Sequence, residues 1–370
     1  MSNDQKLSAL SLFSGAGGMD VGFKAAGCEI LLANDIDADA CETYRLNHGD
    51  VIFEGSVVAL LPLLRHIRDI DIVFGGPPCQ GFSVAGKMDP QDPRSSLTNS
   101  FFDAVDAVQP RAFVCENVKA LAVLEKWESL RQQLLERANE RYHAALVVLN
   151  AHDFGVPQSR ERMFIVGIRK DIFGRTRPEF TTALLNAIEN EKTEAPTIRD
   201  VVRKLGPAGS TSNPRICRAK ITYARTPVMR RSPYAGMLFN GAGRPLNPNG
   251  TSSTLPASMG GNKTPIVDEG EIFEGLKSYV EQYHEQLVCG TKPKSGEAPR
   301  RLRRLTVDEC LAIQTFPPGY KLSGSQSAAY RQIGNAVPSR LAEAVANAVT
   351  GLLGREARES VEAPLLAAGG

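Results

Sequence analysis

Apolar residues in the first half of the chain follow two spacings in turn. Four short apolar runs have the length of buried strands: 7–13, 29–33, 71–74 and 112–115. Three segments between them carry apolar residues at helical spacing: 19–26, 38–47 and 97–108. Further along, the pattern predicts a charged amphipathic helix at 127–142 and two more strands at 144–150 and 163–168. Strands separated by helices predict an α/β domain with a parallel sheet and helices on both faces.

The residue pattern changes after about residue 191. Pro, Gly, Asn, Ser and Thr are frequent in 205–263 and helical periodicity disappears, which predicts a second, smaller domain of loops and short strands. Helical spacing returns at 306–313 and 339–353. We therefore predict a large domain of 1–192 and 326–354, a small domain of 193–300, a hinge of 301–325 and a frayed tail of 355–370.

The chain has 370 residues, of which 42% are apolar and 23% charged, as in globular proteins. No apolar run approaches the ~20 residues that span a bilayer, and the N-terminus lacks the pattern of a signal peptide. The seven cysteines and five histidines are scattered, and no C-x-x-C motif occurs. These features argue against a disulfide framework and a metal site, and they predict a protein of the reducing cytoplasm.

The net charge of +2 is unevenly distributed along the chain. Residues 201–267 contain no Asp or Glu and ten basic residues: Arg203, Lys204, Arg215, Arg218, Lys220, Arg225, Arg230, Arg231, Arg244 and Lys263. Residues 268–285 then contain six acids and one base, Lys277. An acid-free stretch of this length predicts a positive surface, for which a phosphate backbone is the usual partner. The alternative is a solvated basic face that acids elsewhere balance.

Glycines cluster where the first predicted strand meets the first helix, in FSGAGG at 13–18. Such a turn lets a ligand approach the backbone beside the amides of a helix N-terminus. Asp35 ends the second strand, about 20 residues on, where it can accept hydrogen bonds from a ribose. Gly15 and Gly17 fit the dinucleotide pattern G-x-G-x-x-G, but Asp20 occupies the third position, which disfavours a hydride-transfer cofactor. The pairing predicts a nucleoside ligand, with a ligand-free glycine turn as the alternative.

Cys79 lies in GGPPCQGFS, shortly after the third predicted strand. Ligands bind at the carboxyl ends of strands in open α/β sheets, and glycines and prolines there shape a tight turn. A cysteine held in such a turn becomes a nucleophile where a positive charge favours its thiolate. For Cys28, Cys115 and Cys310, inert packing is the better interpretation.

Polar residues also follow two later strands. Glu116 ends the fourth strand, on the same sheet edge as the candidate cysteine, where it can act as a proton donor or hydrogen-bond partner. Gln158, Arg160 and Arg162 lie on one side of an extended segment, and two arginines on one face can hold a phosphate or a carbonyl oxygen. A capping role for the carboxylate and surface salt bridges for the arginines are the alternatives.

Seven segments together resemble the sequence blocks of the cytosine-C5 DNA methyltransferases, in the family's order and over most of the chain. In chain order they are LSLFSGAGGMDVGF, NDID, GGPPCQGFS, CENV, FGVPQSRERMFIVGIR, RRLTVDECLAIQTFPPGY and YRQIGNAVPSRLAEAVA. The basic stretch 201–267 lies between the fifth and the sixth, where the family has a variable region. Seven blocks in order with such a region between them make the resemblance specific.

The resemblance implies transfer of a methyl group from S-adenosylmethionine to C5 of a cytosine that is flipped out of duplex DNA, without a metal. It implies Cys79 as the nucleophile that adds to C6, because covalent addition makes C5 enamine-like. It further implies protonated Glu116 at N3, Arg162 at O2, and Arg160 at a phosphate or the loop. The segment 80–100 has the length and composition of a lid over the base.

Binding residues are implied in the same way. The implied cofactor contacts are Phe13, Gly15, Gly17, Gly18, Asp35, Ile36, Ser56, Val57, Pro78, Asn335 and Ala336. The implied DNA contacts are Gln80, Ser83, Arg94, Gln158, Thr254 and Leu255. The last two are the candidate for the Thr-aliphatic pair of a target-recognition domain, which would be 193–300. The chain departs from the family at three cofactor contacts, where Ser56 replaces an acid, Ile36 an aromatic and Ala336 a serine.

The chain length resembles that of a bacterial restriction-modification enzyme. This implies protection of host DNA, a cognate restriction endonuclease as partner, and a cytoplasmic, nucleoid-associated monomer. Three alternatives stay open. The long acid-free region disfavours an RNA cytosine-C5 methyltransferase, and intact Cys79, Glu116, Arg160 and Arg162 disfavour a silent DNA-binding module. Asp20 opposes a nicotinamide dehydrogenase.

Overall fold

The computed structural model describes residues 6–78 and 96–367, with side chains for 6–78 and 97–354. Contacts within the chain divide it into two compact units. The first unit comprises Met1–Phe154, Glu161–Thr193 and Val337–Gly370, and the second comprises Gly155–Arg160 and Glu194–Ala336.

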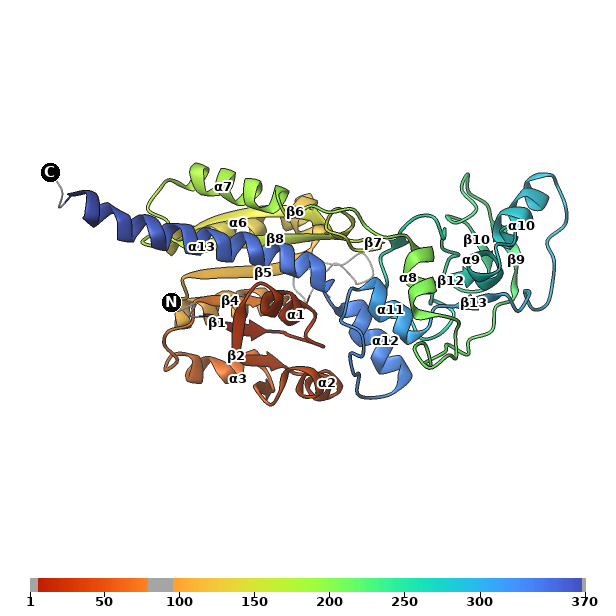
Figure 1. Cartoon of the computed structure of the whole chain (residues 1–370), viewed down its shortest axis with the longest axis horizontal. Coiled ribbons are helices and arrows are strands. Elements are labelled where there is room, and N and C mark those ends of the chain that lie inside the picture. Colours follow the sequence, from red (N-terminus) through yellow and green to blue (C-terminus); the bar gives the residue numbers. More distant parts are fainter. Residues whose placement is uncertain (1–5, 79–95, 368–370) are drawn as a thin grey trace. The chain divides into compact units, whose positions relative to one another are not determined.

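The first unit is built on a seven-stranded sheet of order β3-β2-β1-β4-β5-β8-β6 (Figure 1). Its strands are β1 (Leu7–Leu12), β2 (Cys28–Asp35), β3 (Ile52–Glu54), β4 (Ile72–Gly75), β5 (Ala112–Val118), β6 (Tyr142–Asn150) and β8 (Glu161–Arg169). All neighbours pair in parallel except β8, which is antiparallel to both β5 and β6. The α/β fold class is confirmed. The sheet is mixed because the connection 151–160 is too short for a helical crossover, so β8 returns antiparallel beside β6.

Both faces of this sheet are covered, as the buried strands require. Leu10, Val73 and Phe113 point to one face, under α3 (Val57–Leu64), α4 (Ser96–Val108), α5 (Lys119–Val123) and α6 (Glu128–Arg141). Phe74 points to the other and stacks on Phe23 with ring centroids 3.8 Å apart. The helices on this second face are α1 (Gly18–Ala25), α2 (Ala38–His48), α7 (Arg177–Glu189) and α13 (Ser339–Ala367) (Figure 1). Neighbouring residues of β4 thus face opposite layers, as strand periodicity dictates.

The end of the chain packs on its beginning through α13. A Cβ on Gly22 of α1 would lie 2.4 Å from the Glu343 nitrogen of α13, so only glycine permits this approach. The sequence predicts helix to 353 and a frayed tail beyond, whereas α13 continues to Ala367. Ala, Glu, Arg and Leu predominate in that extension, and these are strong helix formers. None of the described helices has both the length and the apolar character to cross a membrane.

The second unit consists of short elements. Its helices are α8 (Ile198–Leu205), α9 (Glu269–Phe273), α10 (Tyr279–Val288), α11 (Val307–Ile313) and α12 (Gln326–Asn335). Its strands are β7 (Gln158–Ser159), β9 (Tyr223–Val228), β10 (Met237–Phe239), β11 (Ser252–Ser253), β12 (Ile266–Asp268) and β13 (Leu302–Arg304). They form three two-stranded sheets, β9 with β10, β7 with β11, and β12 with β13. Short strands and long loops agree with the sequence pattern after residue 191.

The division into units differs in detail from the sequence-based boundaries. Both place a boundary near residue 193, but the structure keeps α12 with the second unit rather than returning to the first at 326. Two hydrogen bonds hold α12 there: Gln314 Nε2 donates to the Ile333 carbonyl at 2.6 Å, and Tyr330 Oη donates to the Leu305 carbonyl at 2.7 Å. The assignment of separate catalytic and recognition roles to the two parts stays a prediction.

Candidate functional site

A glycine turn joins β1 to α1 at the carboxyl edge of the sheet. Phe13 and Gly15 both have φ of 53°, and Gly17, which precedes the first turn of α1, has φ of 78°. Glycine adopts this left-handed region without strain, which explains its repetition here. No atom outside the turn lies within 4 Å of the position that a Cβ on Gly15 would take. The turn therefore leaves open space beside its main chain.

Asp35, at the end of β2, fastens this turn to the neighbouring strand. Its Oδ2 accepts a hydrogen bond from the Gly15 nitrogen at 2.7 Å, and its Oδ1 accepts one from the Asp37 nitrogen at 2.9 Å. Burial raises the pKa of Asp35 above its ordinary value, and these main-chain donors oppose the shift. Each carboxylate oxygen has a second lone pair, so Asp35 can still accept hydrogen bonds from a ligand.

The surroundings of Asp35 fit a nucleoside. The adjacent Ile36 side chain is 73% exposed, an unusual degree for an aliphatic residue, and offers an apolar surface next to the carboxylate. Open space at the turn, a carboxylate for hydroxyl groups and an apolar surface for a base are the features that a nucleoside cofactor needs. The structure thus brings Phe13, Gly15, Gly17, Asp35 and Ile36 to one edge.

Other predicted cofactor contacts have different surroundings. Gly18 is buried at the start of α1, and Ser56 Oγ accepts a hydrogen bond from the Val58 nitrogen as the N-cap of α3. Val57 packs in the apolar core under the sheet, so its main chain alone is available to a ligand. Asn335 and Ala336, at the end of α12, belong to the second unit.

Glu116 and Arg162 form an ion pair at the same carboxyl edge. Glu116 lies near the carboxyl end of β5 and is 8% exposed, and its Oε1 lies 2.9 Å from Arg162 Nε on the adjacent β8. Its Oε2 lies 2.8 Å from the position that a Cβ on Gly76 would take. Asn117 Nδ2 donates to the Pro77 carbonyl at 3.3 Å, which holds the turn after β4 against β5. The carboxylate is therefore positioned against the main chain that leads through Pro78 to Cys79.

Four predicted site residues, Cys79, Gln80, Ser83 and Arg94, lie outside the described residues. The three cysteines for which the sequence favours inert packing, Cys28, Cys115 and Cys310, are buried. Burial raises the pKa of each of these thiols, that of Cys28 to about 12, which makes them poor nucleophiles at neutral pH.

Gln158 and Arg160 belong to the second unit, whereas Arg162 belongs to the first. Arg160 is buried, and its Nη1 and Nη2 donate to the carbonyls of Leu255 at 3.2 Å and Gly334 at 2.9 Å. These contacts favour the loop-holding role of Arg160 over contact with a phosphate. The sequence places these residues on one side of an extended segment, but the structure divides them between the two units.

Gln158, a predicted DNA contact, is instead buried and hydrogen-bonded within the second unit. It is fully buried, its Oε1 accepts a hydrogen bond from the Leu255 nitrogen, and its Nε2 donates to Gln314 Oε1, both at 2.9 Å. Thr254 is exposed, and its Oγ1 donates to the Ser159 carbonyl at 3.0 Å. Sequence patterns missed Gln314, whose only signal is its position beside the sixth block's apolar helix.

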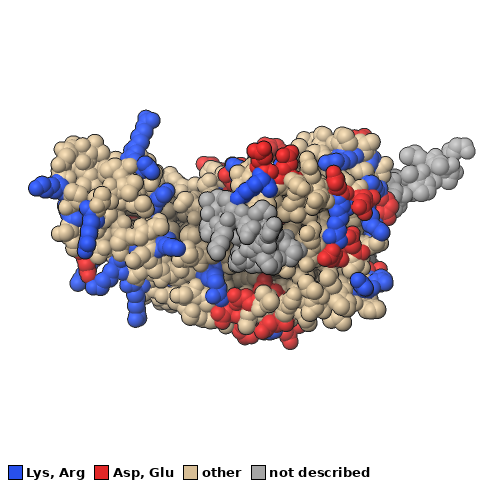
Figure 2. Space-filling view, turned by 180° about the vertical axis from the view of Figure 1, so that it is seen from behind, with Lys and Arg blue, Asp and Glu red and all other residues tan. Residues whose placement is uncertain are grey.

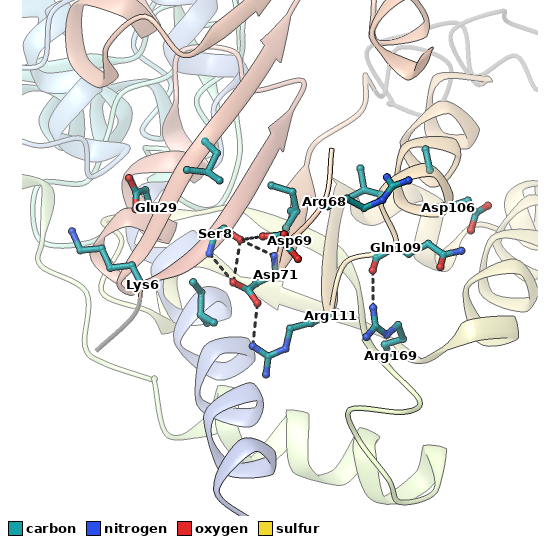
Figure 3. A pocket seen from close by; sticks show the side chains of 15 residues that line it. Lys6, Ser8, Glu29, Arg68, Asp69, Asp71, Asp106, Gln109, Arg111 and Arg169 are labelled. Carbon is teal, nitrogen blue, oxygen red and sulfur yellow. Dashed lines mark hydrogen bonds and ion pairs between the residues drawn. The ribbon is translucent and has the colours of Figure 1, made fainter. Parts of the chain in front are cut away.

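A wide groove of about 1470 Å³ lies at the opposite edge of the first unit's sheet, where the parallel strands begin (Figure 3). Its charged lining residues are Lys6, Arg68, Arg111, Arg169, Glu29, Asp69, Asp71 and Asp106. Asp71 accepts hydrogen bonds from the Ser8 nitrogen at 2.9 Å and from Arg111 Nη1 at 3.0 Å, which joins β1 to the starts of β4 and β5. Four positive and four negative charges cancel, so this groove lacks the charge excess that DNA favours.

The sheet order, the single antiparallel strand and the glycine turn define the fold of S-adenosylmethionine-dependent methyltransferases. Two solved structures share it across nearly their whole length. The S. pombe Dnmt2 methyltransferase is 20% identical with a TM-score of 0.61, and 95% of this chain aligns with 99% of it. The Entamoeba histolytica methyltransferase EhMeth is 16% identical with a TM-score of 0.64, over 95% of this chain and 98% of that one.

The chain belongs to the C-5 cytosine-specific DNA methylase family, which it matches over residues 7–351. It is therefore a DNA (cytosine-5-)-methyltransferase, of a family whose methyl donor is S-adenosylmethionine. Type II methyltransferase M.NgoFVII of Neisseria gonorrhoeae is 33% identical over 91% of this chain and 84% of its own length. Type II methyltransferase M1.HphI of Haemophilus parahaemolyticus is 34% identical over 93% and 86%. The resemblance found in the sequence is confirmed, and the dehydrogenase alternative is wrong.

Proposed function

We propose that this enzyme methylates C5 of one cytosine within a specific duplex DNA sequence through a covalent adduct with Cys79. The relatives named type II methyltransferases support a further step, that it is the modifying enzyme of a restriction-modification system acting on cytoplasmic, nucleoid DNA. A restriction endonuclease of the same specificity would then be its functional partner.

The proposed chemistry begins at C6 of the flipped cytosine, since C5 and C6 are inaccessible inside the stacked duplex. The Cys79 thiolate adds to C6, and the electron pair of the C5–C6 bond moves through the ring toward N3. Glu116 donates a proton to N3, so that negative charge does not accumulate on the ring. C5 then carries enamine-like electron density and would form the new bond to the methyl carbon as the donor's carbon–sulfur bond breaks. Loss of the C5 proton to a base, departure of Cys79 as the thiolate and return of the N3 proton to Glu116 restore the neutral aromatic ring.

Arg162 has two tasks in this scheme. It pairs with Glu116 at 2.9 Å and so positions the carboxylate, and its guanidinium would hold the cytosine O2. An arginine beside the carboxylate favours its charged form, so Glu116 must take up from solvent the proton that it donates to N3. Arg160 holds the neighbouring loops and is a positioning residue.

S-adenosylmethionine supplies the methyl group when it is bound. The residues of the first unit that would hold it are the Gly15 turn for the main-chain approach, Asp35 for the ribose hydroxyls and Ile36 for the adenine face. These residues lie at the carboxyl edge that also carries Glu116, as ligand sites of open α/β sheets do.

One observation carries the proposal: the 2.9 Å pair of Glu116 and Arg162 rests against the turn that leads to Cys79. Because Gly76 has no Cβ, the carboxylate can lie against this turn. Gly76→Ala should displace the carboxylate and reduce methyl transfer while leaving the fold intact.

The test is methyl transfer from labelled S-adenosylmethionine to unmethylated duplex DNA, with Cys79→Ser and, as control, the exposed Cys289→Ser. We expect 5-methylcytosine from wild type and from the control but none from Cys79→Ser. A duplex containing 5-fluorocytosine should trap wild type in a denaturant-resistant complex, because the C5 fluorine cannot leave as a proton does. Methylation of RNA alone, or full activity of Cys79→Ser, would overturn the proposal.

A further inference from the structure

Arg304, in β13 of the second unit, is a buried cation without a counter-ion. It is 1% exposed, and no carboxylate among the described residues forms an ion pair with it. Its Nη1 donates to the Thr264 carbonyl at 2.6 Å, and its Nη2 donates to the Asn240 carbonyl and side-chain oxygen, both at 3.1 Å. Burying a guanidinium without a carboxylate is costly, so its retention calls for a reason beyond packing.

The two carbonyl partners of Arg304 lie on two loops, 240–244 and 261–264, which run side by side. The Gly243 nitrogen donates to the Asn262 carbonyl at 2.9 Å, and the Ile266 nitrogen donates to the Arg244 carbonyl at 2.9 Å. A Cβ on Gly243 would lie 2.0 Å from the Thr264 carbonyl oxygen and 2.7 Å from Arg304 Nη1. The main chains of the two loops are therefore in direct contact, and the Arg304 guanidinium is hydrogen-bonded to both.

Each loop carries one exposed cation, Arg244 on the first and Lys263 on the second. Neither side chain makes a hydrogen bond or ion pair with any described residue. Two other cations of the unit are paired, since Lys220 binds Glu297 and Arg215 binds Asp308. On the second unit, at the left of Figure 2, Lys and Arg side chains project with few Asp or Glu among them. The charges of Arg244 and Lys263 are thus available to bind a negatively charged partner.

We propose that Arg304 is a positioning residue for DNA binding, which fixes the loops 240–244 and 261–264 so that Arg244 and Lys263 contact phosphates of the duplex. Of the remaining residues of the loop tips, Gly241, Ala242 and Gly261 have no side-chain donors for reading base edges, whereas the exposed Asn262 has an amide. Small residues also let the main chain approach a sugar-phosphate backbone closely. The inference deepens the proposed function and rests on it for the duplex substrate.

The test measures the affinity of the full chain for a fluorescent random-sequence duplex across a series of KCl concentrations. Each phosphate contact contributes about 0.9 to the slope of log K against log salt, so Arg244→Ala and Lys263→Ala should each weaken binding about eightfold near 0.1 M salt. The slope should decrease by about 0.9 for each variant. Lys220→Ala, which removes an exposed but paired cation, is the matched control and should bind as wild type does.

Arg304→Lys tests the positioning role, because lysine keeps the charge but not the planar fork that reaches two loops. We expect it to weaken binding as the Arg244→Ala/Lys263→Ala double variant does, and to cause no further loss when added to that double variant. Binding of S-adenosylmethionine, followed by thermal shift, should stay unchanged in all variants. A loss from Arg304→Lys that multiplies with the double variant's loss would overturn the positioning role.

The surface variants keep the inference falsifiable if Arg304→Lys does not fold. Wild-type affinity and slope in both Arg244→Ala and Lys263→Ala would overturn it, as would a loss confined to the methylated target sequence. Failure of the proposed function is seen separately: wild type would then bind duplex DNA but yield no 5-methylcytosine.

Discussion

In the first unit a seven-stranded sheet buries apolar side chains on both faces, whereas the second unit has two-stranded sheets and an apolar cluster of seven buried residues. The difference extends to the buried polar groups. In the first unit the buried polar groups are mostly neutral, such as Ser11 and Asn34, and Glu116 pairs with Arg162 at the edge of the sheet. The second buries polar and charged residues throughout: Gln158, Arg160, Asn213, Thr264, Asp268, Arg304, Glu309 and Gln314.

This comparison indicates that polar residues have different roles in the two units. A sheet held by apolar burial tolerates few polar groups in its interior, so those at its edge are free to serve chemistry. The loops of the second unit bury little apolar surface, and hydrogen-bonded networks must hold them instead. Changes to polar residues should therefore affect activity in the first unit and stability in the second.

Glu116→Gln is the strongest test of the first half of this comparison. The amide is isosteric and keeps a contact with Arg162, but it cannot donate an acidic proton to N3, so we expect methyl transfer to fall about 10²–10⁴-fold. The fold should be retained, which fluorescence of Trp127 can verify because this single tryptophan is buried in the first unit. Initial rates with saturating DNA measure the loss.

Glu161→Gln is the matched control, since Glu161 pairs with Lys119 on the surface near the same edge. Its activity should stay within about twofold of wild type, because exposed ion pairs contribute little. Equal losses in both variants would mean that charge near the edge, rather than the Glu116 carboxyl, governs the rate.

The same contrast explains what could be predicted from the sequence. In the first unit, apolar runs placed β1, β4 and β5 within a few residues, and strand ends brought Asp35 and Glu116 to one edge. The missed elements lack periodicity: β3 has three residues, and α3 is apolar on every side with Pro62 inside it. A capping box at Thr176 was an available signal for the missed α7.

In the second unit the decisive contacts could not be predicted from sequence patterns. Arg304 contacts Asn240, 64 residues earlier, and Gln158 contacts Gln314, 156 residues later. Neither pair belongs to a regular period, and a buried glutamine has the same signature in a sequence as an exposed one. The sequence therefore could not show that Gln158 is buried, and a DNA contact was predicted for it.

Glu309→Ala tests the second half of the comparison. The buried carboxylate accepts hydrogen bonds from Arg303 at 2.6 and 2.8 Å, from the Thr306 nitrogen at 2.9 Å and from Asn213 at 3.1 Å. Its removal leaves the positive charge of Arg303 less neutralised, so we expect the second unit to lose about 3–5 kcal/mol of stability. Urea unfolding should show this in tyrosine absorbance, since six of the eight tyrosines lie in the second unit.

Trp127 fluorescence provides the internal reference in the same experiment. Its transition should stay near that of wild type if the two units unfold separately. Glu297→Ala, which breaks an exposed pair with Lys220, should change neither transition by more than about 0.5 kcal/mol. A large shift of the tryptophan transition in Glu309→Ala would show that the stability of the first unit depends on the polar network of the second.

Asp20 is an exception to the comparison, because it is a buried carboxylate inside the first unit. Burial raises its pKa to about 6 from an ordinary 3.8, although Tyr44 Oη donates to it at 2.8 Å. The folded state thus binds the proton more tightly than the unfolded state, so the stabilising effect is complete below pH 4 and is lost as pH rises through 6. This difference corresponds to about 3 kcal/mol.

Asp20→Asn should remove this pH dependence, because the amide does not ionise. Trp127 fluorescence during urea unfolding at pH 4.5 and 7.5 measures it, and wild type should lose more stability between the two than the variant does. Parallel pH profiles of the two proteins would mean that Asp20 stays ionised at both values and that the unit accommodates its charge.

The smallest expected effect is that of removing a helix N-cap, which both units contain. Thr176 and Thr197 each cap a helix through a capping box, with Glu179 and Asp200 as the reciprocal partners. Each Thr→Ala substitution removes the cap's hydrogen bond and should cost about 1 kcal/mol in the unit that contains it. Tryptophan fluorescence should report the change at Thr176 and tyrosine absorbance the change at Thr197. Because the local chemistry is the same, a clearly larger loss at Thr197 would mean that α8 supports the surrounding polar network as well as its own helix, and would sharpen the contrast between the two units.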